Sequence, residues 1–349
     1  MSSSPTAAGE FSLIARHFQR RQPLRHAALG LGDDCALLQP LPGEQLAIST
    51  DTLVADRHFF ADADPAAIGH KALAVNLSDL AAMGAQPLAF TLALTLPAAD
   101  EPWLAAFAHG LLALADAHGC DLIGGDTTRG PLSLTITVFG SVPREQALLR
   151  SGAQAGDDIY VSHGATQGLG DALLALHLLQ AQKGQAPAPA LGYLSASQQS
   201  ALLQTLQARL EWPTPRVALG QQLRGVASAC IDLSDGLQGD IRHLLAASGT
   251  GATLWAQNPD GTGLLTAASP SLRTLGDAAA IDYALAGGDD YELLFTAAPA
   301  QRAALHAIAN RTHLALARIG QMDAAPGLRL QHANGQAEAV AGKGYDHFS

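Results

Sequence analysis

The stretch DPAAIGHKALAVNLSDLAAMGAQPLAFTLALTL, residues 64–96, decides the fold because it holds the clearest helix signal of the chain next to a clear strand signal. Asp64 suits the N-cap of a helix, and Pro65 suits its first turn. Gly84 follows the last periodic apolar position and suits a left-handed stop. A helix from about Pro65 to Met83 is therefore predicted. In the rest of the stretch, apolar side chains recur at every second position, which is the period of a half-buried strand.

Helices and strands continue to alternate on both sides of this stretch. A second helix is predicted from near Pro102 to a stop at Gly119. The other elements expected in the first half are a helix over residues 11–20 and strands over 46–50, 87–96 and 132–139, which pair in one sheet. In the second half we expect strands over 159–162, 228–233 and 291–296, a helix over 237–248, and a hairpin turn at Asn334-Gly335.

The order of these elements predicts an α+β fold of two domains rather than one doubly wound sheet. A length of 349 residues also fits two domains of ordinary size. The polar, glycine-bearing stretch from Arg144 to Asp158 places the boundary near residue 150, which gives domains over 1–149 and 150–349. Residues 180–190, rich in alanine, glutamine and proline, are expected to form a surface connection.

The composition limits the classes of function. Hydrophobic residues make up 48% of the chain and charged residues 15%, so it can bury ample apolar surface. A formal net charge of −11 argues against a nucleic-acid partner, because that binding needs basic residues against backbone phosphate. No apolar run approaches the roughly 20 residues of a membrane span, and no secretory signal is visible, so we expect a cytoplasmic protein. Cys35, Cys120 and Cys230 are expected to be reduced packing residues.

Five short acidic segments stand where an apolar run meets glycine, serine or threonine. They are Gly32-Asp33-Asp34, Ser49-Thr50-Asp51-Thr52, Gly124-Gly125-Asp126-Thr127-Thr128, Ile231-Asp232-Leu233-Ser234-Asp235-Gly236 and Gly287-Gly288-Asp289-Asp290-Tyr291-Glu292. A strand end followed by small residues puts a carboxylate at the rim of a sheet, a common location for ligand sites. Carboxylate and hydroxyl oxygens suit Mg²⁺, which shares its coordination with waters and substrate phosphates. Each segment alone is more often a turn or a cap, but their recurrence indicates a site for metal and phosphate.

A sixth carboxylate, Asp79, lies inside the first predicted helix. On helical spacing it shares a mostly apolar stripe with Ile68, Ala72, Val75, Asn76 and Met83. A lone carboxylate in a buried stripe is costly unless something binds it, and a metal ion is one candidate. The alternative is that Asn76, a backbone amide or water satisfies it.

Other signatures of nucleotide binding are missing from the sequence or weak. No G-x-x-x-x-G-K-[ST] motif occurs, so the nucleotide cannot be held by a P-loop. The Gly30-Leu31-Gly32 segment lacks the third glycine of the dinucleotide fingerprint. His58 could contact a substrate, although a single histidine is more often a surface or packing residue. Arg150 stands at the expected domain boundary. Two interpretations of it are equally open, namely a residue that binds phosphate and a plain exposed charge.

Together the motifs resemble the thiamine-monophosphate kinase family from near residue 9 to near residue 347. The resemblance rests on Gly9-Glu10-Phe11, Gly32-Asp33-Asp34, Ser49-Thr50-Asp51, residues 76–84, residues 123–128, residues 232–236 and Lys343-Gly344-Tyr345-Asp346. It implies magnesium-dependent transfer of the ATP γ-phosphoryl group to thiamine monophosphate, which gives thiamine diphosphate and ADP. It also implies membership of the superfamily of aminoimidazole ribonucleotide synthetase and selenophosphate synthetase. In these proteins an N-terminal α+β domain forms a homodimer through its sheet, a C-terminal α+β domain follows, and ATP binds in the cleft between them.

The resemblance also assigns roles to individual residues. Several magnesium ions would be held by Asp34, Thr50, Asp51, Asp79, Asp126, Asp232 and Asp235, with Ser49 as a further candidate that the sequence does not rank against Thr50. The nucleotide would meet Gly125, Asp126, Arg150 and Ser234, and thiamine monophosphate would lie near His58, Asp289 and Tyr345. Asp51 and Asp126 are expected to matter most for turnover. Asp289 departs from the family pattern, in which glutamate often stands, so its shorter side chain leaves the substrate affinity open.

Two other functions are compatible with the sequence. The first is another ATP-dependent enzyme of the same superfamily that acts on a different phosphate or acyl acceptor, and a substrate screen with ATP separates it from the kinase. The second is a non-catalytic sensor of magnesium nucleotide that signals through its dimer. Binding of ATP without turnover on any acceptor would identify the sensor.

Overall fold

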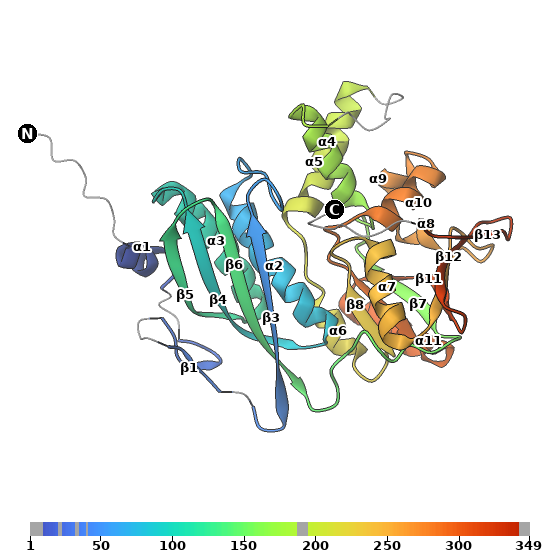
Figure 1. Cartoon of the computed structure of the whole chain (residues 1–349), viewed down its shortest axis with the longest axis horizontal. Coiled ribbons are helices and arrows are strands. Elements are labelled where there is room, and N and C mark those ends of the chain that lie inside the picture. The colour runs from blue at the N-terminus through green and yellow to red at the C-terminus, as the bar shows by residue number, and fades with distance from the viewer. Residues whose placement is uncertain (1–9, 20–22, 32–34, 40, 187–194, 342–349) are drawn as a thin grey trace, which may run out of the picture. The chain divides into compact units, whose positions relative to one another are not determined.

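The computed structural model describes residues 10–19, 23–31, 35–39, 41–186 and 195–341 of the chain (Figure 1). Two candidate residues, Asp34 and Tyr345, lie outside the described residues, and so do the motifs that contain them. The chain divides into two compact units, of which the first is Met1–Leu80 with Ala85–Arg144 and the second is Ala81–Gly84 with Glu145–Ser349.

The first unit holds a four-stranded sheet with two long helices on one face (Figure 1). The strand order is β3-β6-β4-β5, in which β4 and β5 are parallel and the other neighbours are antiparallel. The strands are β3 (Glu44–Val54), β4 (Gln86–Leu96), β5 (Asp121–Arg129) and β6 (Ser133–Pro143), and the helices are α2 (Pro65–Ala82) and α3 (Glu101–His118). Helix α1 (Glu10–His17) and the antiparallel pair β1 (Ala27–Leu29) and β2 (Leu37–Leu38) precede them. The predicted mixture of helix and strand, paired in one sheet, is confirmed.

Local signals set the ends of both long helices. Asp64 Oδ1 accepts a hydrogen bond from the Ala66 N–H at 2.9 Å, and Gly84 follows α2 with a φ of 65°. Asp100 caps the start of α3 with its side chain, and Gly119 ends this helix in the left-handed conformation. Both helices therefore begin and end within a residue of the predicted positions.

Glycine allows the two helices to touch backbone to backbone. A Cβ atom on Gly69 of α2 would lie 2.1 Å from the Phe107 carbonyl oxygen. A Cβ atom on Gly110 of α3 would lie 1.9 Å from the Ala66 carbonyl oxygen. Any side chain at either position would force the helices apart, so the hydrogen atom of glycine is required at both.

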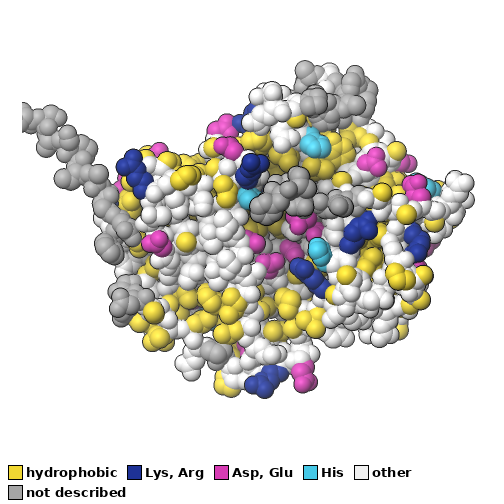
Figure 2. All heavy atoms as spheres, viewed as in Figure 1, with side chains coloured by type: hydrophobic (Ala, Val, Ile, Leu, Met, Phe, Trp, Pro, Cys, Tyr) yellow, Lys and Arg dark blue, Asp and Glu magenta, His cyan; other side chains and the backbone are white. Residues whose placement is uncertain are grey.

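The opposite face of this sheet is open within the first unit. Side chains of β3 alternate, so that Leu46, Ile48 and Val54 are 40%, 59% and 36% exposed while Leu53 on the helix side is buried. Figure 2 shows hydrophobic side chains gathered over the lower ends of the strands on this face. An apolar sheet face of this kind is typical of an interaction surface.

The second unit is built on a seven-stranded sheet in the order β13-β12-β9-β11-β7-β10-β8 (Figure 1). Neighbouring strands are antiparallel except for β9 and β12, which are parallel. The strands are β7 (Asp158–His163), β8 (Ala229–Asp232), β9 (Gly251–Trp255), β10 (Leu293–Ala297), β11 (Ala315–Asp323), β12 (Gly327–Gln331) and β13 (Ala337–Ala339). The helices are α4 (Asp171–Gln182), α5 (Ala196–Glu211), α6 (Val217–Leu223), α7 (Leu237–Ser248), α8 (Leu264–Ala267), α9 (Pro270–Arg273), α10 (Asp277–Ala286) and α11 (Arg302–Thr312), with a 3-10 turn η1 (Pro299–Gln301).

Several elements of the second unit match the sequence prediction. Helix α7 has the predicted bounds and ends at the left-handed Gly249. Strands β7, β8 and β10 agree within two residues, and the hairpin of β12 and β13 turns at Gly335 with a φ of 82°. The connection expected over residues 180–190 begins inside α4, and its last four residues lie outside the described residues. In the described part of the chain, no helix has both the length and the apolar character of a membrane span.

Candidate active site

In the first unit, β3 and α2 bring three candidate residues together. The Ser49 hydroxyl donates a hydrogen bond to Asp79 Oδ2, which joins the strand to the helix. Two residues further along β3, the Asp51 N–H donates to Asn76 Oδ1 at 3.1 Å. Asn76 is held in turn by donation to the Ala72 carbonyl oxygen at 3.0 Å. Ser49, Asp51 and Asp79 therefore offer hydroxyl and carboxylate oxygens along one strand–helix contact.

One expectation about β3 needs correction, and the structure also shows on which face of the sheet Thr50 lies. Asp51 was expected at the end of a strand, but β3 continues to Val54 and Asp51 lies inside it. The Thr50 side chain lies on the open face of the sheet, where its hydroxyl pairs with the Thr137 hydroxyl at 2.9 Å. Because side chains alternate along a strand, the Thr50 hydroxyl points away from the face that carries Ser49 and Asp51.

The structure also shows the surroundings of Asp79. The stripe around it is buried, since Ile68, Ala72, Val75 and Asn76 are at most 5% exposed. Asp79 itself is only partly buried, and the protein supplies the Ser49 hydroxyl as a donor. The Ser49 hydroxyl is therefore one group that satisfies this carboxylate, and the role of Asp79 as a metal ligand stays a prediction. Its place beside Ser49 and Asp51 is what keeps it in the candidate site.

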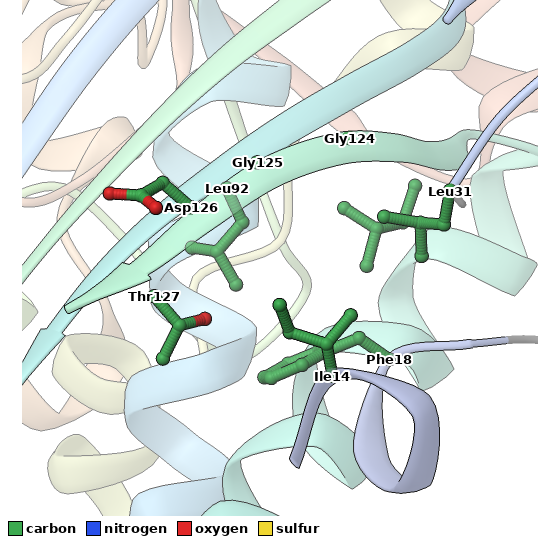
Figure 3. A pocket seen from close by; sticks show the side chains of 9 residues that line it. Ile14, Phe18, Leu31, Leu92, Gly124, Gly125, Asp126 and Thr127 are labelled. Atoms are coloured by element: carbon green, nitrogen blue, oxygen red, sulfur yellow. The ribbon is translucent and has the colours of Figure 1, made fainter. Parts of the chain in front are cut away.

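Gly125 and Asp126 lie in the middle of β5 rather than after a strand. Gly125 has a φ of 150°, and a Cβ atom there would lie 1.9 Å from the Leu92 carbonyl oxygen on β4. Only glycine fits this close approach of two backbones. Asp126 follows with an exposed side chain that points away from Ile14 and Phe18 (Figure 3).

A small pocket borders this glycine segment. It is lined by Ile14, Phe18, Leu31, Leu92, Leu122, Gly124, Gly125, Asp126 and Thr127 (Figure 3). It offers about 30 Å³, whereas sites for small molecules of ordinary size take roughly 300–1,000 Å³. The pocket therefore has room for about one water molecule and cannot itself enclose a nucleotide.

His58 lies in the turn that follows β3. Its Nδ1 atom accepts a hydrogen bond from the Val54 N–H at 3.0 Å. The buried Lys71 donates to the His58 carbonyl oxygen at 3.2 Å. A ring nitrogen that accepts a hydrogen bond carries no proton, so the neutral ring has its proton on Nε2. The turn therefore fixes both the backbone and the ring orientation of this candidate.

In the second unit, the loop after β8 carries three more candidates. Asp232 stands at the end of the strand, as predicted, and its side chain is buried. Ser234 and Asp235 follow it. Their backbone N–H groups both donate to Asp240 Oδ2, at 3.0 and 3.1 Å. Burial, and then the nearby charges of Asp235 and Asp232, raise the pKa of Asp240 to about 7. Sequence reasoning missed Asp240, although its place in the first turn of α7 was a signal of a capping carboxylate.

The loop Gly287–Glu292 is bound to this first loop through the backbone. The Asp289 N–H donates to the Ser234 carbonyl oxygen at 2.9 Å, and the Tyr291 N–H donates to the Leu233 carbonyl oxygen at 2.7 Å. Ser234 and Asp289, expected to meet different substrates, therefore lie side by side. The loop precedes β10, in agreement with the strand predicted over 291–296, so this acidic segment stands at the start of a strand and not after one.

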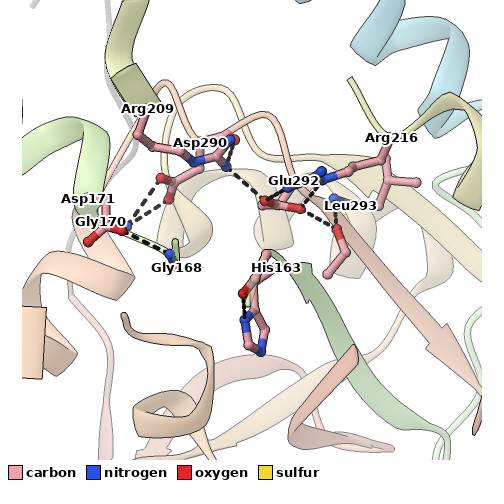
Figure 4. Close-up of polar contacts among 11 residues, drawn as sticks. His163, Gly168, Gly170, Asp171, Arg209, Arg216, Asp290, Glu292 and Leu293 are labelled. Atoms are coloured by element: carbon pink, nitrogen blue, oxygen red, sulfur yellow. Dashed lines mark hydrogen bonds and ion pairs between the residues drawn. The ribbon is translucent and has the colours of Figure 1, made fainter. Parts of the chain in front are cut away.

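Two acidic residues of this loop face the interior and are not available as ligands. The Glu292 side chain, which is fully buried, binds Arg216, Arg209 and Ser162. Asp290, 1% exposed, accepts the Gly170 N–H at 2.9 Å (Figure 4). These carboxylates are structural, although the acidic pattern had grouped them with ligand candidates.

Arg150 lies on the segment that leads into the second unit. Its side chain is exposed, and its carbonyl oxygen accepts a hydrogen bond from the Ser248 hydroxyl at 3.1 Å. The preceding carbonyl, of Leu149, accepts the Cys230 N–H at the start of β8 at 2.8 Å. The backbone of Arg150 is thus fixed while its guanidinium reaches solvent.

The donor types in both units fit magnesium. Among the described residues, no group of three or more His, Cys, Asp or Glu side chains forms a ready cage for a metal. Magnesium does not need one, because it usually takes one or two carboxylates and completes its shell with water and phosphate. The Ser49, Asp51 and Asp79 oxygens and the Asp232 and Asp235 carboxylates are donors of this type.

Comparison with known proteins gives this geometry a family context. A family model for AIR synthase related protein, N-terminal domain, matches residues 32–142. The chain is 47% identical over 345 residues to thiamine-monophosphate kinase of Salmonella typhimurium, and the match covers 98% of this chain and 99% of that protein.

Solved structures agree with this relationship. Thiamine-monophosphate kinase from Stenotrophomonas maltophilia K279a is 47% identical, has a TM-score of 0.75, and covers 93% of this chain and 95% of its own. The structure of AaThiL complexed with AMPPCP and TMP is 26% identical, has a TM-score of 0.69, and covers 97% of each chain. With near-complete coverage and identity this high, the chain belongs to the thiamine-monophosphate kinase family.

Proposed function

We propose that this protein transfers the γ-phosphoryl group of ATP to the phosphate of thiamine monophosphate, forming thiamine diphosphate and ADP. The observation that carries the proposal is 47% identity over 345 residues to a relative named thiamine-monophosphate kinase, with coverage of 99% of that relative. The related structure that holds AMPPCP, an analogue of ATP, together with TMP supports the same pair of substrates.

In the proposed reaction, an oxygen of the acceptor phosphate attacks the γ-phosphorus, and the bond from that phosphorus to the β-phosphate oxygen breaks. The attacking oxygen carries little bound proton at neutral pH, so the protein needs no dedicated general base. Its task is to align the two phosphates and to stabilise the charge that develops between them. Exposed Asp126 and the backbone at Gly125, which has no side chain, suit the approach of a nucleotide with its metal.

Magnesium ions, when bound, would neutralise phosphate charge and bridge the nucleotide to the protein. The residues proposed to hold them are Ser49, Asp51, Asp79, Asp126, Asp232 and Asp235, with Asp34 and Thr50 as further candidates. We also propose that Arg150 and Ser234 meet the nucleotide and that His58, Asp289 and Tyr345 meet thiamine monophosphate. For the last five residues, the family resemblance is the main support.

A homodimer is part of the proposal. Support comes from the open face of the sheet β3-β6-β4-β5, where Leu46 and Ile48 are 40% and 59% exposed. A second copy of the chain would remove this apolar surface from water. Light scattering of the purified protein tests this point, and a dimer weakened by Ile48→Glu would agree with it.

The deciding experiment is a coupled assay of purified protein with ATP, Mg²⁺ and thiamine monophosphate, with EDTA as the control. Thiamine diphosphate formed with Mg²⁺ and lost with EDTA is the expected result. Product from a different phosphate or acyl acceptor, with none from thiamine monophosphate, would indicate another enzyme of the superfamily. Binding of ATP without turnover on any acceptor would indicate a nucleotide sensor.

A further inference from the structure

The loop Gly287–Glu292 contains two residues in a backbone conformation that side chains disfavour. Asp289 has a φ of 62° and Tyr291 a φ of 47°. Asp tolerates this left-handed region, but a bulky aromatic residue is rarely found there. Such strain persists only where the surroundings impose it, and it is concentrated at functional sites.

The strained pair is joined through its side chains. The Tyr291 hydroxyl donates a hydrogen bond to Asp289 Oδ1 at 3.0 Å. Tyr291 is 8% exposed, so its ring is packed into the protein while its hydroxyl reaches the carboxylate. The two side chains therefore meet across one intervening residue of the loop.

The residues between and after this pair hold the loop to the interior. The Asp290 carboxylate accepts the Gly170 N–H at the start of α4, at 2.9 and 3.2 Å from its two oxygens. Arg209 of α5 donates to the Asp290 carbonyl oxygen. Figure 4 shows Arg209 and Arg216 converging on Glu292, with nitrogen–oxygen distances of 2.9 Å for Arg209 and 2.6 and 2.7 Å for Arg216.

These buried contacts of Asp290 and Glu292, the anchor of the loop, also have an unfavourable energetic side. Arg209 is 1% exposed, and its Nε and Nη1 atoms have no hydrogen-bond partner within the described residues. A buried cation with unpaired donors and two strained backbone positions would not persist for packing alone, since simpler apolar packing would serve a purely structural loop. The arrangement instead gives Asp289 one defined position.

We propose that Tyr291 is a positioning residue for Asp289, whose carboxylate it holds in place to receive a substrate that carries a cationic ring and, on a second ring, an amino group that donates hydrogen bonds. The buried anchor of Asp290 and Glu292 enforces the loop conformation that this pairing needs. The proposal rests on the proposed function, because thiamine monophosphate carries both a thiazolium cation and an aminopyrimidine donor. A carboxylate accepts several hydrogen bonds, so the one from Tyr291 leaves capacity for the ring.

The test compares Tyr291→Phe, Asp289→Asn and the double variant in steady-state kinetics, with each substrate varied in turn. Tyr160→Phe is a matched control, because the Tyr160 hydroxyl also donates to an aspartate two residues away, Asp158, at 3.3 Å. Asp158 is separately held by Arg302, so its position does not depend on that tyrosine.

For Tyr291→Phe we expect KM for thiamine monophosphate to rise roughly tenfold, as for loss of one hydrogen bond to a charged group. KM for ATP, kcat and Tm should stay close to wild type, and Tyr160→Phe should change none of them. The double variant should be no worse than Asp289→Asn, because Tyr291 acts through that carboxylate.

Three outcomes would overturn the inference. If Tyr291→Phe leaves KM for thiamine monophosphate within twofold of wild type, the hydroxyl does not position Asp289. If both KM values and Tm change together, the tyrosine has only a structural role. If wild-type protein makes no thiamine diphosphate, the proposed function fails and this inference fails with it, whereas the first two outcomes leave that function intact.

Discussion

The Ser49 hydroxyl donates its hydrogen bond to the Asp79 carboxylate, so the middle of a strand and the last turns of a helix share one polar contact. Thr50, the next residue, turns its hydroxyl to the opposite face and pairs with Thr137. The sequence alone could not rank Ser49 against Thr50 as a metal ligand. Strand geometry favours the Ser49 side chain, because it lies on the same face as Asp51.

Ser49→Ala should raise the Mg²⁺ concentration needed for half-maximal rate by about tenfold. The variant loses a hydroxyl that either binds the metal itself or orients the Asp79 carboxylate that binds it. Thr50→Ala should have a smaller effect. Thr52→Ala is the control, because the Thr52 hydroxyl pairs with Thr135 on the open face at 2.9 Å. A Mg²⁺ titration of the initial rate measures all three, and a larger shift for Thr50→Ala than for Ser49→Ala would reverse the ranking.

Asp51→Asn and Asp126→Asn should each lower kcat by at least about a hundredfold while the protein stays folded, because each removes a charge proposed to act on the metal–phosphate complex. Asp116→Asn is the control, because this carboxylate of α3 is 40% exposed and forms a surface ion pair with Arg25, at a distance of 3.7 Å. Kinetics and thermal melts of the three variants decide the point. Near-normal turnover in both site variants would contradict the proposed roles.

Elements whose signals are local could be predicted from the sequence. The cap at Asp64 and the stop at Gly84 act within one helical turn, so the ends of α2 can be read from neighbouring residues without knowledge of tertiary contacts. The same holds for Gly119 and Gly249. The sequence also marked Asp51 and Asp126 as candidates, and these roles stay predictions. It did not predict their position inside strands, because strand ends depend on pairing with distant segments.

The buried anchor in the second unit could not be predicted. Glu292 is 83 residues from Arg209 and 76 from Arg216 along the chain. Nothing near either arginine marks it as buried, and charged residues are usually exposed. The acidic pattern therefore grouped Asp290 and Glu292 with ligand candidates, although their burial needs a fold that joins α5, α6, β7 and β10.

Gly125→Ala should destabilise the first unit by at least about 2 kcal/mol and reduce turnover, because the new Cβ would clash with the backbone of β4 at a disfavoured φ. Gly124→Ala is a matched control one residue away, since a Cβ there would lie 3.6 Å from Thr91 Cγ2, an ordinary contact. Urea denaturation and the coupled assay measure both effects. Equal stability of the two variants would show that the strands can separate to accept a side chain.

Glu292→Gln should lower the free energy of unfolding by about 3–5 kcal/mol, because it leaves two buried arginine charges without their counter-charge. Although burial opposes ionisation, Arg216 and Arg209 hold the pKa of Glu292 below its ordinary value, so the charge is present in the native state. Glu338→Gln is the control, as this side chain is 67% exposed beside His332. If Glu292→Gln lowers the free energy of unfolding no more than Glu338→Gln does, water must solvate the two arginines in place of the Glu292 carboxylate.

His118, in the last turn of α3, should make stability depend on pH. Burial, and then the nearby His70, lower the pKa of His118 below its ordinary value of 6.5. Between pH 6.5 and the lower pKa of the native state, His118 is protonated in the unfolded chain but neutral in the folded protein. The neutral, buried His118 therefore contributes fully to stability above pH 6.5, and this contribution is lost as the pH falls. His118→Gln should therefore show a smaller drop in Tm between pH 7 and pH 5 than wild type. His109→Gln, on an exposed position of the same helix, should keep the wild-type slope, and a slope unchanged by His118→Gln would assign the acid sensitivity to other groups.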